Sequence, residues 1–123
     1  MPVPLRVSSL LITDALAGAS DLYRQLGFEP VPTDDEACIG FTAGTTGVIL
    51  TSREFAASCW GEPVAAELAG RVVPYVYLQH LSDSDDVGDT IFEGWTQYGT
   101  HDRIVGTAFG PMVLVERAHP LTL

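Results

Sequence analysis

The chain has 123 residues, of which 46% are hydrophobic and 18% are charged, so it is long enough for one domain with a buried core and too apolar to be disordered. Sixteen acidic residues against six basic ones give a net charge of −10. Nucleic acid and anionic membrane surfaces are therefore excluded as partners, whereas a cationic small ligand would be attracted.

The first residues and the two cysteines favour a cytoplasmic location. Residues 1–6 lack the basic region, apolar core and cleavage site of a signal peptide. No apolar run approaches the roughly 20 residues that span a bilayer. Cys38 and Cys59 have neither the spacing of metal ligands nor the density of a disulfide scaffold, so reduced thiols are expected.

The first predicted elements are a strand and a helix. The strand covers Leu5 to Thr13. Asp14 is expected to cap the helix that follows, because a carboxylate accepts from free N–H groups of the first turn. Gly27 supplies the left-handed residue that ends this helix. Its apolar face is predicted from residues at helical spacing, namely Leu16, Ala19, Leu22, Tyr23 and Leu26.

A hairpin and a less regular connection come next. Residues 37–43 and 46–52 form the two strands of a predicted hairpin around Gly44 and Thr45. Residues 53–71 are interpreted as a connection with one short helix, and Trp60 is expected in a loop.

The second half begins with a predicted strand from Val72 to Leu81. A helix is predicted from about Val87 to Tyr98, because apolar residues recur at helical spacing and would place Trp95 in the core. The preceding acidic residues suit a helix start better than a calcium loop, since no Gly and Glu follow at the required positions. A last hairpin is predicted from residues 101–108 and 112–117.

The two halves repeat one pattern. Val7 to Asp14 matches Val76 to Asp83 in its order of apolar and turn residues, and each is followed by a predicted helix and two strands. The sequence thus predicts a single α+β domain, residues 1–123. It consists of two βαβββ-type modules, about 5–55 and 72–117 with a connection at 56–71, which form a curved mixed sheet around a cleft.

The phrase Leu22-Tyr23-Arg24-Gln25-Leu26-Gly27-Phe28, after a strand ending in Ile12-Thr13-Asp14, resembles the vicinal oxygen chelate superfamily. That group includes glyoxalase I, bleomycin resistance proteins, fosfomycin resistance enzymes and extradiol dioxygenases. The resemblance extends from Leu5 to Arg117. It is weaker in the second half, where Ala108-Phe109-Gly110-Pro111 replaces the usual turn before the last strand.

The resemblance implies a metal site whose donors this chain lacks. The usual first-strand histidine corresponds to Val7 in one module and to Val76 in the other. A register shifted by one residue would bring in Ser8, or Tyr75 and Tyr77, which are also poor ligands. The last-strand positions hold Ser52 and Glu116, and one carboxylate cannot hold a metal that needs about three or four donors. No catalytic residue, metal ligand or cofactor is therefore assigned.

Six residues are candidates for ligand contact. Small side chains expected on the concave face are Ser9, Ser52 and Val76. Trp60 is an aromatic residue that could cover a flat ligand, or a loop anchor packed on the core. His80 and Glu116 add polar groups.

Each polar candidate has an alternative interpretation. His80 shares a face with Val76 but lies about 13 Å along the strand, at the rim. Glu116 could instead pair with Arg6, Arg103 or Arg117. The two other histidines, His101 and His119, are expected at the surface.

These features favour a non-catalytic protein of the glyoxalase/bleomycin resistance type. It would be a homodimer that binds and sequesters an antibiotic-like small molecule, cationic or aromatic, without a cofactor. The alternatives left open are a metal-dependent lyase, isomerase or dioxygenase of the same superfamily, a metal-free enzyme using Glu116 or His80 as an acid–base group, and a structural or regulatory dimer.

Overall fold

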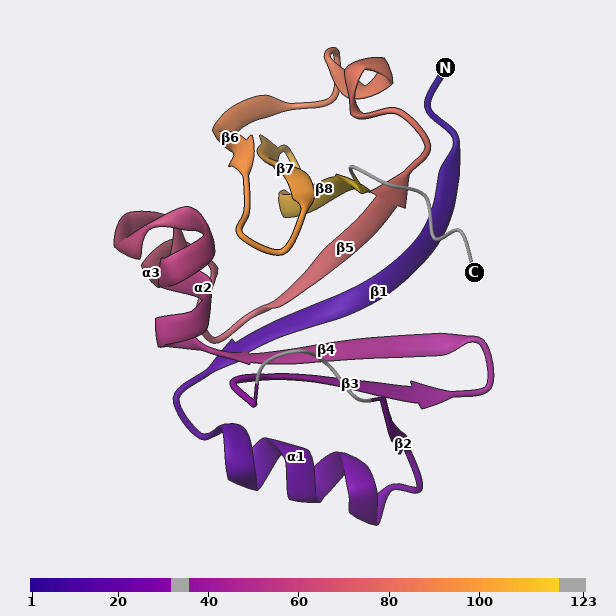
Figure 1. Cartoon of the computed structure of the whole chain (residues 1–123), viewed down its shortest axis with the longest axis vertical. Helices are drawn as coiled ribbons and strands as arrows, with labels where there is room; N and C mark the ends of the chain where they lie inside the picture. Colours follow the sequence, from indigo (N-terminus) through magenta and orange to yellow (C-terminus); the bar gives the residue numbers. More distant parts are fainter. Residues whose placement is uncertain (32–35, 118–123) are drawn as a thin grey trace. The chain divides into compact units, whose positions relative to one another are not determined.

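The computed structural model describes residues 1–31 and 36–117 (Figure 1). His119, expected at the surface, lies outside the described residues. The elements, in chain order, are β1 (Pro4–Thr13), α1 (Leu16–Gln25), β2 (Glu29–Val31), β3 (Cys38–Ala43), β4 (Thr46–Ser52), α2 (Arg53–Trp60), α3 (Glu62–Leu68), β5 (Val72–Leu78), the 3₁₀ helix η1 (Leu81–Ser84), β6 (Asp89–Trp95), β7 (Thr100–Thr107) and β8 (Gly110–Arg117). The predicted α+β class is confirmed. None of the described helices is long and apolar enough to cross a membrane.

The chain divides into two compact units. The first unit is Ser8–Val73, and the second consists of Met1–Val7 together with Pro74–Leu123. β1 therefore contributes to both. In the second unit, the amide of Gln79 donates to the carbonyl of Val3 at 3.0 Å, which ties the start of the chain to the end of β5.

Strands of the first unit follow the order β2-β3-β4-β1. β3 and β4 are antiparallel, so the predicted hairpin is confirmed, and Gly44 takes the positive φ of 60° that its tight turn requires. β4 then pairs with β1 in parallel, with Ser9 opposite Val48 and Leu11 opposite Leu50. Both strand directions occur, as the predicted mixed sheet requires.

The helix α1 is held on this sheet by aromatic packing. Tyr23 stacks on Phe41 of β3 at 5.9 Å and meets the edge of Phe28 at 5.1 Å. Gly27, with φ of 93°, reverses the chain so that the amide of Phe28 donates to the carbonyl of Tyr23 at 3.0 Å. The predicted end of the helix is thus confirmed, and the aromatic residues of the LYRQLGF phrase serve packing.

Two details predicted for α1 are wrong. Leu22 and Leu26 are 53% and 65% exposed, because the side of this short helix that faces the sheet carries Leu16, Ala19, Ser20 and Tyr23 instead. Asp14 is not the cap. Ala15 occupies the N-cap position, and among the described residues no side chain caps α1.

The connection between the halves contains two helices where one was predicted. α2 begins at the cap residue Ser52, whose hydroxyl accepts from the amide of Phe55 at 3.1 Å. Gly61, with φ of 89°, separates α2 from α3. The buried residues are Ala56 and Trp60 in α2 and Ala65 and Leu68 in α3. Trp60 is therefore only 7% exposed at the end of a helix, and its predicted loop position is wrong.

The second unit has the strand order β5-β8-β7-β6, with β8 parallel to β5 and antiparallel to β7. Its predicted last hairpin is confirmed, with Thr107 opposite Gly110 across the turn. The strand predicted at 72–81 is also confirmed, although it ends at Leu78 and η1 follows after two residues.

The helix predicted from Val87 to Tyr98 is wrong, because Asp89–Trp95 of this segment form the strand β6. A bulge between Thr90 and Phe92 adds one residue to the strand and breaks its alternation of faces. Ile91 and Trp95 are four residues apart in the sequence, a spacing that fits one face of a helix and equally one face of a strand. The β-branched and aromatic residues Thr90, Ile91 and Phe92 favour the observed strand.

Replacing Gly88 by alanine should destabilise the second unit. Gly88 has φ of 64°, and a Cβ there would lie 2.6 Å from the carbonyl oxygen of Gly106. We expect Gly88→Ala to lower the unfolding free energy by about 3 kcal/mol, from strain plus the backbone clash. Urea denaturation measures the change.

Gly99→Ala is the matched control. Gly99 also has a positive φ, of 77°, but nothing lies within 4 Å of its added Cβ. Its cost should be the strain alone, about 1 kcal/mol. Equal losses in the two variants would show that the approach of Gly88 to β7 is not as close as described.

Candidate functional site

Several polar residues of the second unit lie on one face of its sheet. Val76 lies opposite Leu114, Glu93 opposite Arg103, and His101 opposite both Trp95 and Glu116. Because side chains alternate between faces along a strand, these residues share one side. Leu81 of η1 packs on the same side, against the cluster formed with Leu78, Val105 and Leu114. We call this side the η1 face.

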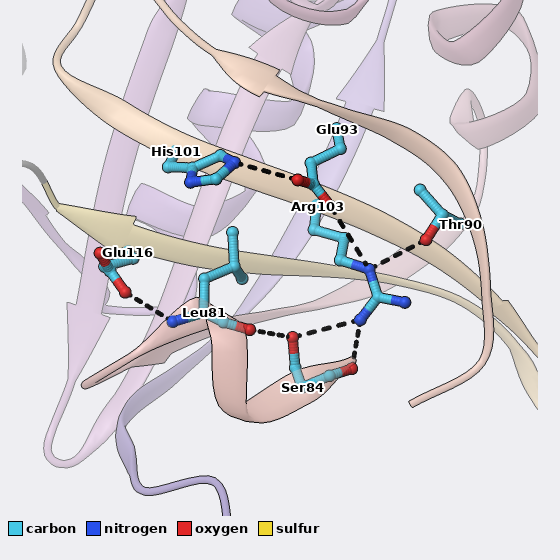
Figure 2. Close-up of polar contacts among 7 residues, drawn as sticks. All are labelled: Leu81, Ser84, Thr90, Glu93, His101, Arg103 and Glu116. Atoms are coloured by element: carbon cyan, nitrogen blue, oxygen red, sulfur yellow. Dashed lines mark hydrogen bonds and ion pairs between the residues drawn. The ribbon is translucent and has the colours of Figure 1, made fainter. Parts of the chain in front are cut away.

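Arg103 is the most highly bonded residue of the η1 face. Its side chain is 6% exposed. Its guanidinium donates to the carbonyl oxygen of Ser84, to the hydroxyl of Ser84 at 3.2 Å and to the carbonyl of Asp85 at 3.3 Å. Its Nε donates to the hydroxyl of Thr90 at 3.0 Å (Figure 2). One cation therefore joins η1, β6 and β7.

Glu93 and His101 lie next to this arginine. A carboxylate oxygen of Glu93 lies 3.4 Å from Nε2 of His101, and its other oxygen lies 3.8 Å from Nε of Arg103. Figure 2 shows Glu93 between the two. The imidazole of His101 is also stacked on Trp95, with ring centroids 5.0 Å apart. Trp95 is 60% exposed, so its predicted core position is wrong, since it belongs to a strand and not to a buried helix face.

Glu116 holds the start of η1. Its carboxylate accepts from the amide of Leu81 at 2.5 Å, and Ser84 closes the same turn by donating to the carbonyl of Leu81 (Figure 2). Two of the arginines suggested as partners are engaged elsewhere. Arg103 faces Ser84, and Arg117 stacks over the ring of Tyr77 at 5.1 Å.

The other two candidates of the second unit, Val76 and His80, differ in their surroundings. Val76 is partly buried and packs against the apolar cluster of Leu78, Leu81 and Leu114. His80 is exposed and directly precedes η1. Glu116 therefore contacts the backbone of Leu81, the residue that follows His80. Val76 belongs to the apolar part of the same face.

The candidates of the first unit lie on its α1 side or in its helices. Ser9 pairs with Val48, and Ser52 lies opposite Thr13, in register with the residues that pack under α1. They were expected on the side away from the helix. Side chains alternate between the two faces of β1, and the face away from α1 is occupied by Leu10 and Ile12. Ser9 therefore lies on the face that α1 covers. Ser52 caps α2, and Trp60 is buried at its end.

Sequence reasoning missed the group formed by Glu93, His101 and Arg103. With residues 87–98 read as a helix, Glu93 had no cross-strand neighbour in β7. The available signal was the run Thr90-Ile91-Phe92 before Gly94, which is typical of a strand. A β6–β7 hairpin would then have aligned Glu93 with Arg103, and Trp95 with His101.

Similar folds are found among solved structures. A glyoxalase/bleomycin resistance protein/dioxygenase superfamily member from Vibrio splendidus 12B01 aligns with a TM-score of 0.58 and 16% identity, over 94% of this chain and 99% of that chain. An uncharacterised protein from Methanosarcina mazei aligns with a TM-score of 0.52 and 17% identity, over 98% and 99%. No family model and no curated protein matches the sequence. The chain thus has the fold predicted from the LYRQLGF phrase.

The side chains do not fit the metal site that the superfamily would imply. The position expected for a histidine holds Val76, which is partly buried and packs against an apolar cluster. Glu116 is already bonded to a backbone amide. Within residues 1–31 and 36–117, no three histidine, cysteine, aspartate or glutamate side chains come together as ligands would.

Removing the guanidinium of Arg103 should destabilise the fold. Arg103→Met preserves most of the side-chain length but leaves the acceptors at Ser84, Asp85 and Thr90 without their donor. We expect a loss of about 3 kcal/mol in unfolding free energy, measured by urea denaturation. Arg71→Met, at an exposed position, is the control and should cost under about 0.5 kcal/mol. Similar stability of both variants would contradict the described network.

The capping role of Ser52 predicts how its substitution changes stability. Ser52→Ala should lower the unfolding free energy by about 1 kcal/mol, because it removes the acceptor for the amide of Phe55. Ser52→Asp retains an acceptor and should restore most of that loss. Thermal unfolding of the three proteins tests this, and an alanine variant as stable as the parent would speak against a cap.

Proposed function

We propose that this chain binds and sequesters a small organic molecule, as a non-catalytic protein of the glyoxalase/bleomycin resistance type. The observation that carries the proposal is the packing of Val76. The strand position expected to supply a metal donor lies opposite Leu114 and belongs to an apolar cluster. A face built in this way can hold an apolar or aromatic group but cannot polarise a substrate as a Lewis acid does.

Charge and aromatic content support a cationic or aromatic ligand. The net charge of −10 attracts cations over several ångströms. Trp95 is an exposed aromatic ring next to a partly exposed carboxylate, Glu93. The homodimeric state and the cytoplasmic location expected from the sequence remain part of this proposal, and light scattering of the purified protein tests the first of them.

An acid–base enzyme is the second candidate. It is favoured by the contact between Glu93 and Nε2 of His101 at 3.4 Å, since a carboxylate beside an imidazole can orient it for proton transfer. His101 takes this role in place of His80, which is exposed and has no carboxylate contact among the described residues.

Metal content and ligand stabilisation together test the proposed function. Purified protein should contain far less than one equivalent of zinc, nickel, iron or manganese by mass spectrometry. Bleomycin and other cationic aromatic antibiotics, screened by thermal shift, should include at least one that raises the melting temperature by several degrees. That ligand should be recovered chemically unchanged after incubation.

Two results would contradict the proposed function. A stoichiometric transition metal that stabilises the protein would restore the metal-dependent alternative. Conversion of the stabilising ligand into a product, lost in His101→Asn but retained in His80→Asn, would establish the acid–base enzyme instead.

A further inference from the structure

The end of β6 carries an aromatic ring that is both exposed and held in place. Trp95 is 60% exposed. His101 stacks on one side of the indole, with ring centroids 5.0 Å apart and planes inclined by 21°. The adjoining turn is closed by the amide of Thr96, which donates to the carbonyl of Thr100 at 2.8 Å. The ring is therefore supported before any ligand arrives, which reduces the entropy lost on binding.

Glu93 supplies a negative charge beside this ring. It lies two residues before Trp95 on the same face of β6, about 7 Å along the strand. Its side chain is 49% exposed, and its contacts with His101 and Arg103, at 3.4 and 3.8 Å, are longer than ordinary hydrogen bonds. The carboxylate thus retains acceptor capacity for an incoming cation.

The nearest positive charge does not oppose such a ligand. The guanidinium of Arg103 is buried and directed at the carbonyl groups of Ser84 and Asp85. Asp85, Asp86 and Asp89 lie at or before the opposite end of β6, since Asp89 pairs with Gly106 and Trp95 with His101. The negative charge beside the indole on β6 is therefore that of Glu93.

We propose that Trp95 and Glu93 form a binding subsite for a planar organic cation, with the exposed side of the indole stacking on the ligand and the carboxylate of Glu93 facing its charge. This inference rests on the proposed function, because it specifies where a sequestered ligand makes contact. Aromatic rings attract cations through their negative faces, and a neighbouring carboxylate adds selectivity for charge.

Isothermal titration with a matched pair of probes tests the subsite. The probes are 10-methylacridinium, which is a permanent cation, and acridine, which has the same ring system and is neutral at mildly alkaline pH. The cation should bind the parent protein more tightly than acridine. Trp95→Leu should weaken the cation about tenfold, and Glu93→Gln about fivefold with loss of the preference for the cation.

Matched variants control for generic aromatic or charge effects. Phe109→Leu removes the fully exposed ring of the β7–β8 turn, and Glu67→Gln removes an exposed carboxylate of α3. Both should bind 10-methylacridinium with the affinity of the parent. Thermal unfolding confirms that each variant is folded. Glu93→Gln keeps the shape of the side chain, so it remains informative if Trp95→Leu fails to fold.

Three results would overturn the subsite. The first is parent-like affinity for the cation in both Trp95→Leu and Glu93→Gln. The second is equal binding of acridine and 10-methylacridinium. The third is a change from dimer to monomer in Trp95→Leu with unchanged probe affinity, which would identify Trp95 as a subunit contact. If a ligand stabilises the parent and both variants equally, the proposed function survives and the subsite alone fails, whereas the absence of any stabilising organic ligand defeats both.

Discussion

A buried arginine is the constraint on which the second unit depends. Arg103 has a side-chain exposure of 6%, and a buried guanidinium is tolerated only where its donors find acceptors. Those acceptors come from η1, from the residue after it and from β6. The segment between β5 and β7 must therefore fold close to β7 for the charge to be satisfied. The first unit secures the corresponding segment, α1, by apolar packing of Tyr23 on its sheet.

The η1 face of the second unit has an apolar part and a polar part. Where β5 meets β8, Val76 and Leu114 belong to an apolar cluster that closes the η1 face to polar chemistry. Where β6 meets β7, Glu93, His101 and Trp95 form a polar and partly exposed group. Arg103 contacts this group through the carboxylate of Glu93. The proposed cation subsite therefore lies at the β6–β7 hairpin and not at the positions where the superfamily's metal donors would lie.

The sequence predicted the parts of the fold whose local and global signals agree. The β3–β4 and β7–β8 hairpins, β1 and the end of α1 at Gly27 all follow from spacing and turn residues. β6 was missed because Val87, Ile91 and Trp95 recur every four residues, which fits one face of a helix as well as one face of a strand. Candidate residues were misplaced for a related reason. Leu10, Leu11 and Ile12 are all apolar, so the pattern did not reveal which side of β1 faces α1, and Ser9 was assigned to the wrong one.

Amide hydrogen exchange of Arg103→Met, compared with the parent protein, tests the central claim most directly. If the guanidinium holds η1 and β6 to β7, amides of residues 81–95 should lose protection by at least about tenfold, while those of α1, β3 and β4 keep theirs. Two results would contradict the view that Arg103 organises the second unit. One is a loss of amide protection that is uniform across both units, and the other is unchanged protection in residues 81–95.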